Sequence, residues 1–123
     1  MRIDGVDDPN AWWRCPENFD APLVLFIDWD QEMFVFGQRD LYLRRIEEHT
    51  NTFIQLEQWF TASGQTRVTV VGPLRVKQWL KDMFQGMSSE NLYLHLLGLS
   101  MLRHVQERPL TSADLEDYFR TQS

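Results

Sequence analysis

The pattern of apolar and polar positions predicts three strands and three helices between residues 23 and 87. Residues 23–27 form an unbroken apolar run between Pro22 and Asp28, which is typical of a buried strand. The other predicted elements are helices at 31–36 and 41–49, strands at 51–60 and 67–71, and a helix from Pro73 to about Phe84. The order along the chain is therefore strand, helix, helix, strand, strand, helix.

Two extensions flank this central domain. Three prolines rule out a continuous helix in residues 1–22, and two tryptophans there favour burial. Residues 88–123 contain a helix at 90–107, followed by a shorter helix that Thr111 or Ser112 can cap. We therefore predict one domain with an N-terminal extension and extra C-terminal helices.

The helix predicted at 90–107 is apolar on two nearly opposite sides. One side carries Leu92, Leu96, Leu99 and Leu102, and the other carries Leu94, Leu97, Met101 and Val105. One stripe can cover the core of the domain, whereas the second needs the N-terminal extension, a second copy of the chain or a partner. Intramolecular cover and association are equally compatible with this pattern. The candidate partner-binding residues are Leu94, Leu97, Met101 and Val105.

Composition indicates a folded chain whose charge does not favour a polyanion. Among 123 residues, 43% are hydrophobic and 13% aromatic, which is enough for a packed core. The net charge of −6 argues against nucleic-acid binding by charge alone. The acidity lies mostly in the flanks, because residues 23–87 hold seven basic and eight acidic side chains. Any nucleic-acid affinity should therefore depend on shape, stacking and base-edge contacts.

The cysteine count and the hydropathy pattern predict a soluble intracellular chain. Cys15 is the only cysteine, so no intramolecular disulfide can form, and a reducing compartment is expected. The first ten residues lack the apolar centre of a signal peptide. The leucine-rich stretch 92–105 is too short and too polar to span a bilayer.

The segment between the first two predicted helices has the layout of a phosphate-binding loop. An apolar run ends at Gly37, two polar residues follow, and a helix opens beyond them. The start of a helix is positively polarised, so that a backbone phosphate can bind there. Gln38 and Arg39 can donate hydrogen bonds to phosphate oxygens. The candidate phosphate-binding residues are Gly37, Gln38, Arg39, Asp40, Arg44 and Arg45.

This segment resembles the entry to the Gly-X-X-Gly loop of a type I KH domain. Val35-Phe36-Gly37-Gln38-Arg39-Asp40 matches the loop, and the positions that resemble the rest of the domain are Leu43, Ile46, Thr50, Ile54, Val68, Val70 and Gly72. The runs CPENFDAPLV and FIQLEQWFTASGQTRVTVVGP more specifically resemble the KH-homology-domain-containing protein 1 family. The resemblance implies an α+β fold of order β-α-α-β-β-α, with a three-stranded antiparallel sheet packed on helices.

Asp40 departs from the KH pattern, which has a second glycine at this position so that the backbone can approach phosphates. An aspartate before the helix at 41–49 can cap it by accepting hydrogen bonds from the free amides, an interaction worth ~0.5–2 kcal/mol. The same carboxylate would occupy donors that a phosphate needs and would repel the phosphate. We therefore predict that Asp40 is a structural cap, which leaves room for a weakened phosphate loop.

The resemblance also implies a function. It suggests a cytoplasmic protein that binds single-stranded RNA weakly or selectively, in translational control in the oocyte or early embryo. It also implies, for some members, a role in promoting cell death at the endoplasmic reticulum, and some relatives carry a hydrophobic C-terminal tail that would hold them at that membrane. This sequence ends at Ser123 without such a tail, so membrane anchoring is not expected here.

A KH domain binds four unpaired bases in an apolar groove beside its loop. By analogy, the candidate base-contacting residues are Val35, Leu43, Ile54 and Leu56. Each of these positions is also suited to ordinary core packing. The tryptophans Trp29, Trp59 and Trp79 can stack on bases, although packing in the core is the simpler role.

The sequence favours neither catalysis nor a metal site. His95 and His104 are nine residues apart on one predicted helix and so lie on opposite faces, and Cys15 has no CxxC partner. No Gly-rich NTPase motif is present. We expect no enzymatic activity, no cofactor and no metal. The competing hypothesis is a KH fold that serves as a protein-interaction or dimerisation module through helix 90–107, without binding RNA.

Overall fold

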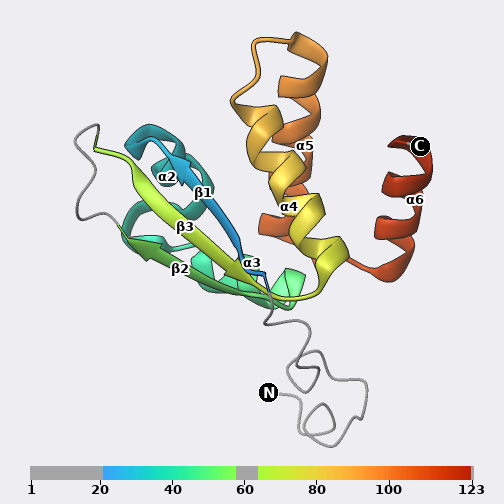
Figure 1. Cartoon of the computed structure of the whole chain (residues 1–123), viewed down its shortest axis with the longest axis horizontal. Coiled ribbons are helices and arrows are strands. Elements are labelled where there is room, and N and C mark those ends of the chain that lie inside the picture. The colour runs from blue at the N-terminus through green and yellow to red at the C-terminus, as the bar shows by residue number, and fades with distance from the viewer. Residues whose placement is uncertain (1–20, 58–63, 123) are drawn as a thin grey trace, which may run out of the picture.

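The computed structural model describes residues 21–57 and 64–122 (Figure 1). Its strands are β1 (Leu23–Ile27), β2 (Phe53–Glu57) and β3 (Thr66–Val71). Its helices are α2 (Trp29–Phe36), the short 3-10 helix η3 (Gln38–Asp40), α3 (Leu43–Thr50), α4 (Leu74–Met87), α5 (Leu92–Glu107) and α6 (Ser112–Gln122). Most of the predicted N-terminal extension, with Cys15, and the end of the strand predicted at 51–60, with Trp59, lie outside the described residues.

The three strands form one antiparallel sheet in the order β1-β3-β2. Val68 in the central strand lies opposite Leu25 of β1 and Leu56 of β2. Figure 1 shows α4 and α5 side by side next to the sheet, with α6 beyond them at the C-terminal end. This arrangement confirms the predicted α+β fold, including its order and its antiparallel sheet.

The core collects side chains from the sheet and from four helices. Its most deeply buried hydrophobic residues are Val35 and Phe36 of α2, Ile46 of α3, Val68 and Val70 of β3, Leu80 and Met83 of α4, and Val105 of α5. These residues recur at strand or helix spacing in the sequence, and this is why the hydrophobic pattern located the elements correctly. Within the described part of the chain, no helix has the length and hydropathy needed to span a membrane.

Strand β1 differs from the prediction of a fully buried strand. Leu25 and Ile27 face the core, whereas the alternate side chains Val24 and Phe26 are 41% and 50% exposed. The reason is that β1 forms an edge of the sheet, and the opposite face of the sheet is open to solvent at these positions. An uninterrupted apolar run does not by itself distinguish a one-sided strand from a strand buried on both faces.

The prediction that one apolar side of helix 90–107 covers the core and the other side binds a partner is wrong for α5. Met101 and Val105, predicted to bind a partner, are buried in the core of the domain together with Leu102 from the other stripe. Leu97 is half-buried against this core, and Leu94 is exposed. Both stripes therefore give their C-terminal halves to the chain's own core, where α5 packs against α3 as well as α4. The candidate stripe Leu94–Val105 is unavailable to a partner over most of its length.

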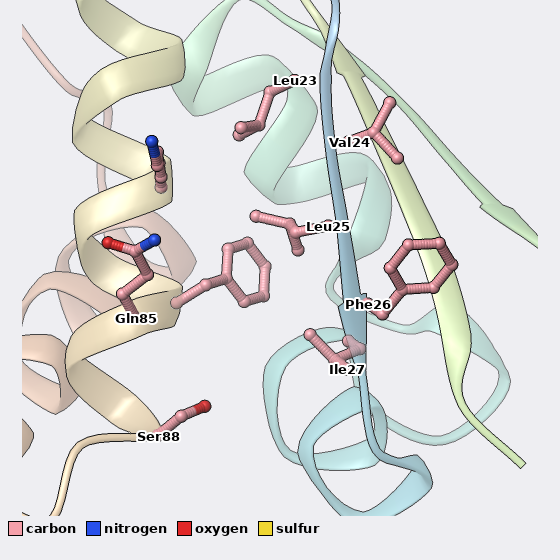
Figure 2. Close-up of a pocket in the computed structure, with 9 residues that line it drawn as sticks. Leu23, Val24, Leu25, Phe26, Ile27, Gln85 and Ser88 are labelled. Carbon is pink, nitrogen blue, oxygen red and sulfur yellow. The ribbon is translucent and has the colours of Figure 1, made fainter. Parts of the chain in front are cut away.

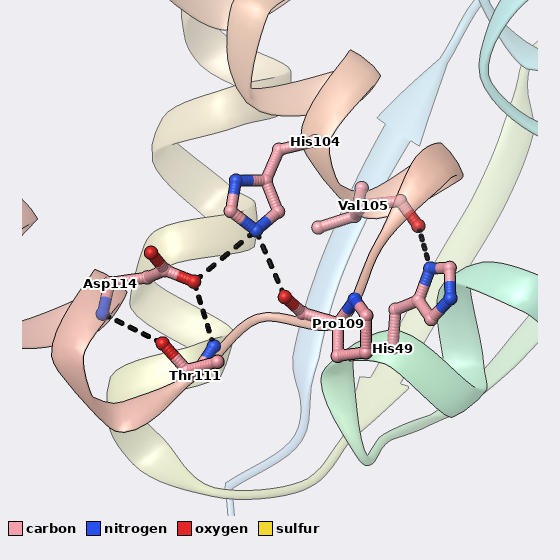
Figure 3. Close-up of polar contacts among 6 residues, drawn as sticks. All are labelled: His49, His104, Val105, Pro109, Thr111 and Asp114. Carbon is pink, nitrogen blue, oxygen red and sulfur yellow. Dashed lines mark hydrogen bonds and ion pairs between the residues drawn. The ribbon is translucent and has the colours of Figure 1, made fainter.

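The start of α6 confirms the predicted cap at Thr111 (Figure 3). Thr111 Oγ1 accepts the N–H of Asp114 at 3.1 Å, and Asp114 Oδ2 accepts the N–H of Thr111 at 2.9 Å. This reciprocal arrangement is a capping box. His104 Nε2 lies 3.0 Å from the carbonyl oxygen of Pro109 and 3.3 Å from Asp114 Oδ2, so the end of α5 is fastened to the start of α6.

We expect the anchorage of α6 to weaken in acid. The hydrogen bond from the Thr111 backbone holds the pKa of Asp114 below its ordinary value of 3.8. The stabilisation is therefore complete above the unfolded value of 3.8 and is lost as the pH falls through the lower folded value. The effect should be at most about 1 kcal/mol, the size of one helix cap on a partly exposed group.

Urea unfolding over a pH series measures this contribution. Asp114→Asn should flatten the acid limb of the stability profile, while Glu116→Gln, at an exposed position of the same helix, should leave it unchanged. An acid limb that is identical in the wild-type protein and in Asp114→Asn would contradict the assignment.

Candidate nucleic-acid interface

The predicted phosphate loop is a tight turn built from left-handed backbone. Gly37 has φ 79°, and Arg39 and Asp40 have φ 58° and 57°. A Cβ atom at position 37 would lie 2.9 Å from Cδ2 of Tyr42, so glycine is required there for space as well as for conformation. The loop closes where the N–H of Tyr42 donates to the carbonyl of Phe36 at 2.7 Å.

The predicted role of Asp40 as the cap of the following helix is wrong. Helix α3 begins at Leu43 with Tyr42 as its N-cap residue, and no side chain of the described residues caps it. The positive φ of Arg39 and Asp40 sets the loop apart from the helix; Leu41 and Tyr42 already have right-handed helical angles, but the α-helix itself begins only at Leu43. The sequence pattern could not reveal the sign of φ at these two positions. The exposed carboxylate of Asp40 therefore does not occupy the helix amides.

The start of α3 consequently presents unused hydrogen-bond donors. In the portion of the chain that the structure describes, the backbone N–H groups of Leu43, Arg44 and Arg45 have no acceptor. The helix dipole adds positive potential at this end. Backbone N–H groups at a helix start are a common site for anions such as phosphate. The predicted donor cluster is thus present, without the competitor that the sequence suggested.

Three arginines are grouped in and just beyond the loop. Arg39 is exposed and forms no ion pair with any described residue. Arg45 lies over the ring of Tyr42, with Cζ 5.9 Å from the ring centroid. Arg44 is 89% exposed and lies 3.8 Å from Glu48, a weak surface pair. Arg39 is therefore the cation in this region with the fewest competing contacts.

The predicted base-contacting residues divide into two groups. Val35 has no exposed surface and Ile54 is only 8% exposed, so neither can contact a base in this conformation. Leu43 and Leu56 are half-buried and retain some accessible surface. Sequence analysis missed Leu41, which is highly exposed directly after the loop. The sequence could have indicated the exposure of Leu41, because this residue does not share the helical spacing of Leu43 and Ile46.

The predicted tryptophans do not share one role, because one described tryptophan is buried and the other is exposed. Trp79 is buried, with its ring edge-on to Tyr118, and belongs to the core. Trp29 is exposed at the first residue of α2, the opposite end of that helix from the loop. Among the residues that the structure describes, no group of three or more His, Cys, Asp or Glu side chains is arranged to hold a metal ion.

Glu47 joins α3 to the outer edge of β2. Its Oε2 accepts the backbone N–H of Ile54 at 2.8 Å. Burial raises the pKa of Glu47, while this hydrogen bond and the nearby Arg44 oppose the rise. The carboxylate therefore occupies an edge donor of β2 and adds negative charge next to the helix that carries the three free amides.

Comparison with known proteins places these features in a family. The family described as KH-like RNA-binding domain matches residues 9–93, which include the loop, α3 and the whole sheet. Human KH homology domain-containing protein 1 is 56% identical over 104 residues, covering 85% of this chain and 44% of the relative. Human KHDC1-like protein is 54% identical over 104 residues, covering 85% of this chain and 81% of the relative.

Relatives are also found in the mouse. KH homology domain-containing protein 1B is 48% identical over 106 residues, covering 86% of this chain and 84% of the relative. The chain spans less than half the length of human KH homology domain-containing protein 1. No solved structure matches. The family match and these identities carry one conclusion: the chain belongs to the KH-like RNA-binding domain family, in the group of the KH homology domain-containing proteins 1.

Proposed function

We propose that this chain binds single-stranded RNA weakly or selectively, through the loop at 37–40 and the start of α3. By family resemblance, the setting would be cytoplasmic translational control in the oocyte or early embryo, with a role in cell death as in some relatives. The observation that carries the proposal concerns the described part of the chain: three amides of α3 have no acceptor there, and the guanidinium of Arg39 has no ion-pair partner there. These groups offer one phosphate both directed hydrogen bonds and charge.

The charge balance sets the expected strength of binding. The net charge of −6 opposes a polyanion, and Asp40 and Glu47 add negative charge around the donors. Binding should therefore involve only one or two phosphate contacts and should weaken with salt. For single strands the slope of log affinity against log salt is about −0.7 per phosphate. We expect a total slope of roughly −0.7 to −1.4.

Arg39→Asp is the direct test. A pool of short, fluorescently labelled single-stranded RNAs is titrated with the full chain at low salt, and anisotropy reports binding. We expect Arg39→Asp to lower affinity by at least about tenfold, because one charge-assisted contact becomes a repulsion.

Arg103→Asp is the matched control. It changes the net charge by the same amount on an exposed position of α5 and should lower affinity less than about twofold at moderate salt. Circular dichroism checks that both variants remain folded. No RNA binding by the wild-type chain at low salt, or equal losses in the two variants, would refute the proposal.

A second candidate function is a protein-interaction module that does not bind RNA. One observation favours it: Leu92, Tyr93 and Leu96 are all exposed in the first half of α5. Because Leu97 packs against the core, the informative substitution is Leu96→Glu rather than Leu97→Glu. Loss of a captured partner in Leu96→Glu, with RNA binding absent in the wild-type chain, would favour this function over the first.

A further inference from the structure

Strand β1 borders a hollow that the RNA proposal does not use. A space of about 290 Å³ lies between this edge strand and α4 (Figure 2). It is lined by all five residues of β1, by Lys81, Phe84 and Gln85 of α4, and by Ser88, which directly follows α4. Figure 2 shows Leu23, Leu25 and Ile27 pointing toward the helix, with Val24 and Phe26 on the other side of the strand.

The two edges of the sheet are protected to different degrees. At the β2 edge, Glu47 occupies the N–H of Ile54, and Glu57 forms an ion pair with Arg67 at 3.7 Å. Strand β1 has no charged residue and no proline between its ends. In the described part of the chain, β3 is its only strand partner. An apolar edge that no other described strand covers is a ready template for another strand.

We propose that β1 pairs in antiparallel fashion with β1 of a second copy of this chain. The two-fold axis passes beside Leu25 and joins the two three-stranded sheets into one sheet of six strands. Leu23 then lies opposite Ile27 of the second copy, and Val24 lies opposite Phe26. Every cross-strand pair is apolar, so the edge is self-complementary, as a two-fold interface requires.

The charges at the rim of the hollow identify a second copy as the occupant. Figure 2 shows Gln85 on the helix at about the level of Leu25, and Ser88 lower, just after the helix, toward the Ile27 end of β1. A helical turn rises about 5.4 Å and two strand residues span about 6.6 Å, so that one turn of α4 corresponds to two residues of β1. Lys81, one turn before Gln85, therefore lies at the level of Leu23, at the beginning of the strand.

The two-fold axis brings this lysine near an acidic residue of the second copy. It places Asp28 of that copy opposite Pro22, at the level of Lys81. Lys81 and Asp28 are both exposed, and neither forms an ion pair with any residue that the structure describes. Among the described residues, the side chain of Asp28 accepts one long hydrogen bond, from Gln65 at 3.4 Å. Symmetry produces the Lys81–Asp28 pair twice in each dimer.

Charge reversal tests the pairing. Sedimentation velocity of the RNA-free full chain between about 1 µM and 1 mM should show a dimer with a micromolar dissociation constant, typical of a small interface. Lys81→Asp and Asp28→Lys should each weaken the dimer about tenfold, because two attractive pairs become repulsive. The double variant exchanges the charges and should recover the wild-type constant to within about twofold.

Substitution on the edge strand provides a second test. Val24→Lys introduces charge at an exposed position of the edge and should make the chain monomeric. Phe53→Lys, on the opposite edge strand and also exposed, should leave the dimer unchanged. A monomer at every concentration would overturn the proposal. This holds whether the chain's own first residues or another protein then fills the hollow. A dimer that is insensitive to Val24→Lys and to both charge reversals would overturn it as well.

Discussion

Asp40→Gly should raise the affinity for single-stranded RNA about five- to tenfold. Removing one carboxylate about 4 Å from a phosphate relieves roughly 1 kcal/mol of repulsion in water, and 1.4 kcal/mol corresponds to a factor of ten. Glycine also adopts the left-handed conformation of this position without strain, and it lets the backbone come closer to the phosphate. The stability of the fold should change little, because Asp40 makes no side-chain hydrogen bond to α3.

Asp40→Asn separates the two causes. Asparagine removes the charge, keeps the bulk and tolerates a positive φ. Equal gains in Asp40→Gly and Asp40→Asn would identify repulsion as the cause, whereas a gain in glycine alone would identify backbone access. Asp30→Asn removes an exposed charge in the first turn of α2, away from the loop, and should have little effect. Unchanged or reduced affinity in both Asp40 variants would contradict the site itself.

Gly98→Leu should cost the fold about 3 kcal/mol or more. Gly98 and Gly86 allow α5 and α4 to touch through their backbones, since a Cβ atom on Gly98 would lie 2.6 Å from the N atom of Met87 and 2.9 Å from the carbonyl oxygen of Met83. Backbone atoms of a packed helix cannot move aside cheaply, so the leucine must push α5 away from the core. The midpoint of thermal unfolding should fall by about 10 °C or more.

Ser100→Leu is the matched control, because it places the same side chain at an exposed position of the same helix. It should change the free energy of unfolding by less than about 0.5 kcal/mol. Thermal and urea unfolding followed by circular dichroism measure both variants. If Gly98→Leu were as stable as Ser100→Leu, the close approach of α4 and α5 would not contribute to the fold.

The sequence predicted the order of the elements because each element buries a periodic apolar face. Ile46 and Thr50 are one helical turn apart and both are buried, and Val68 and Val70 alternate on the central strand. The boundaries near the loop failed for a different reason. The left-handed backbone of Arg39 and Asp40 is a property of φ angles, and the residue types only permit it. The predicted cap, Asp40, therefore lies two residues before the observed N-cap residue, Tyr42.

The sequence could predict which apolar side chains are buried only where an element has a single apolar face. In α5 the helical period was correct, but the half of each stripe that enters the core depends on where α5 crosses α4. The pair Gly86 and Gly98 was the available signal for that crossing, because two glycines on neighbouring helices permit close backbone contact. The sequence predicted a donor cluster at the start of the helix after the loop, but it did not reveal that Asp40 leaves the amides of α3 free. These free amides follow from the absence of a capping side chain among the described residues.

Figure 3 shows that the helix carrying the free amides is secured at its far end by residues from outside the family match. Nδ1 of His49 donates to the carbonyl of Val105 at 2.6 Å, and the carbonyl of His49 accepts the N–H of Leu110 at 2.8 Å. A fragment trimmed to residues 9–93 would lose both tethers, together with Met101, Leu102 and Val105 from the interior. The smallest autonomous unit able to present the loop should therefore extend at least to Leu110.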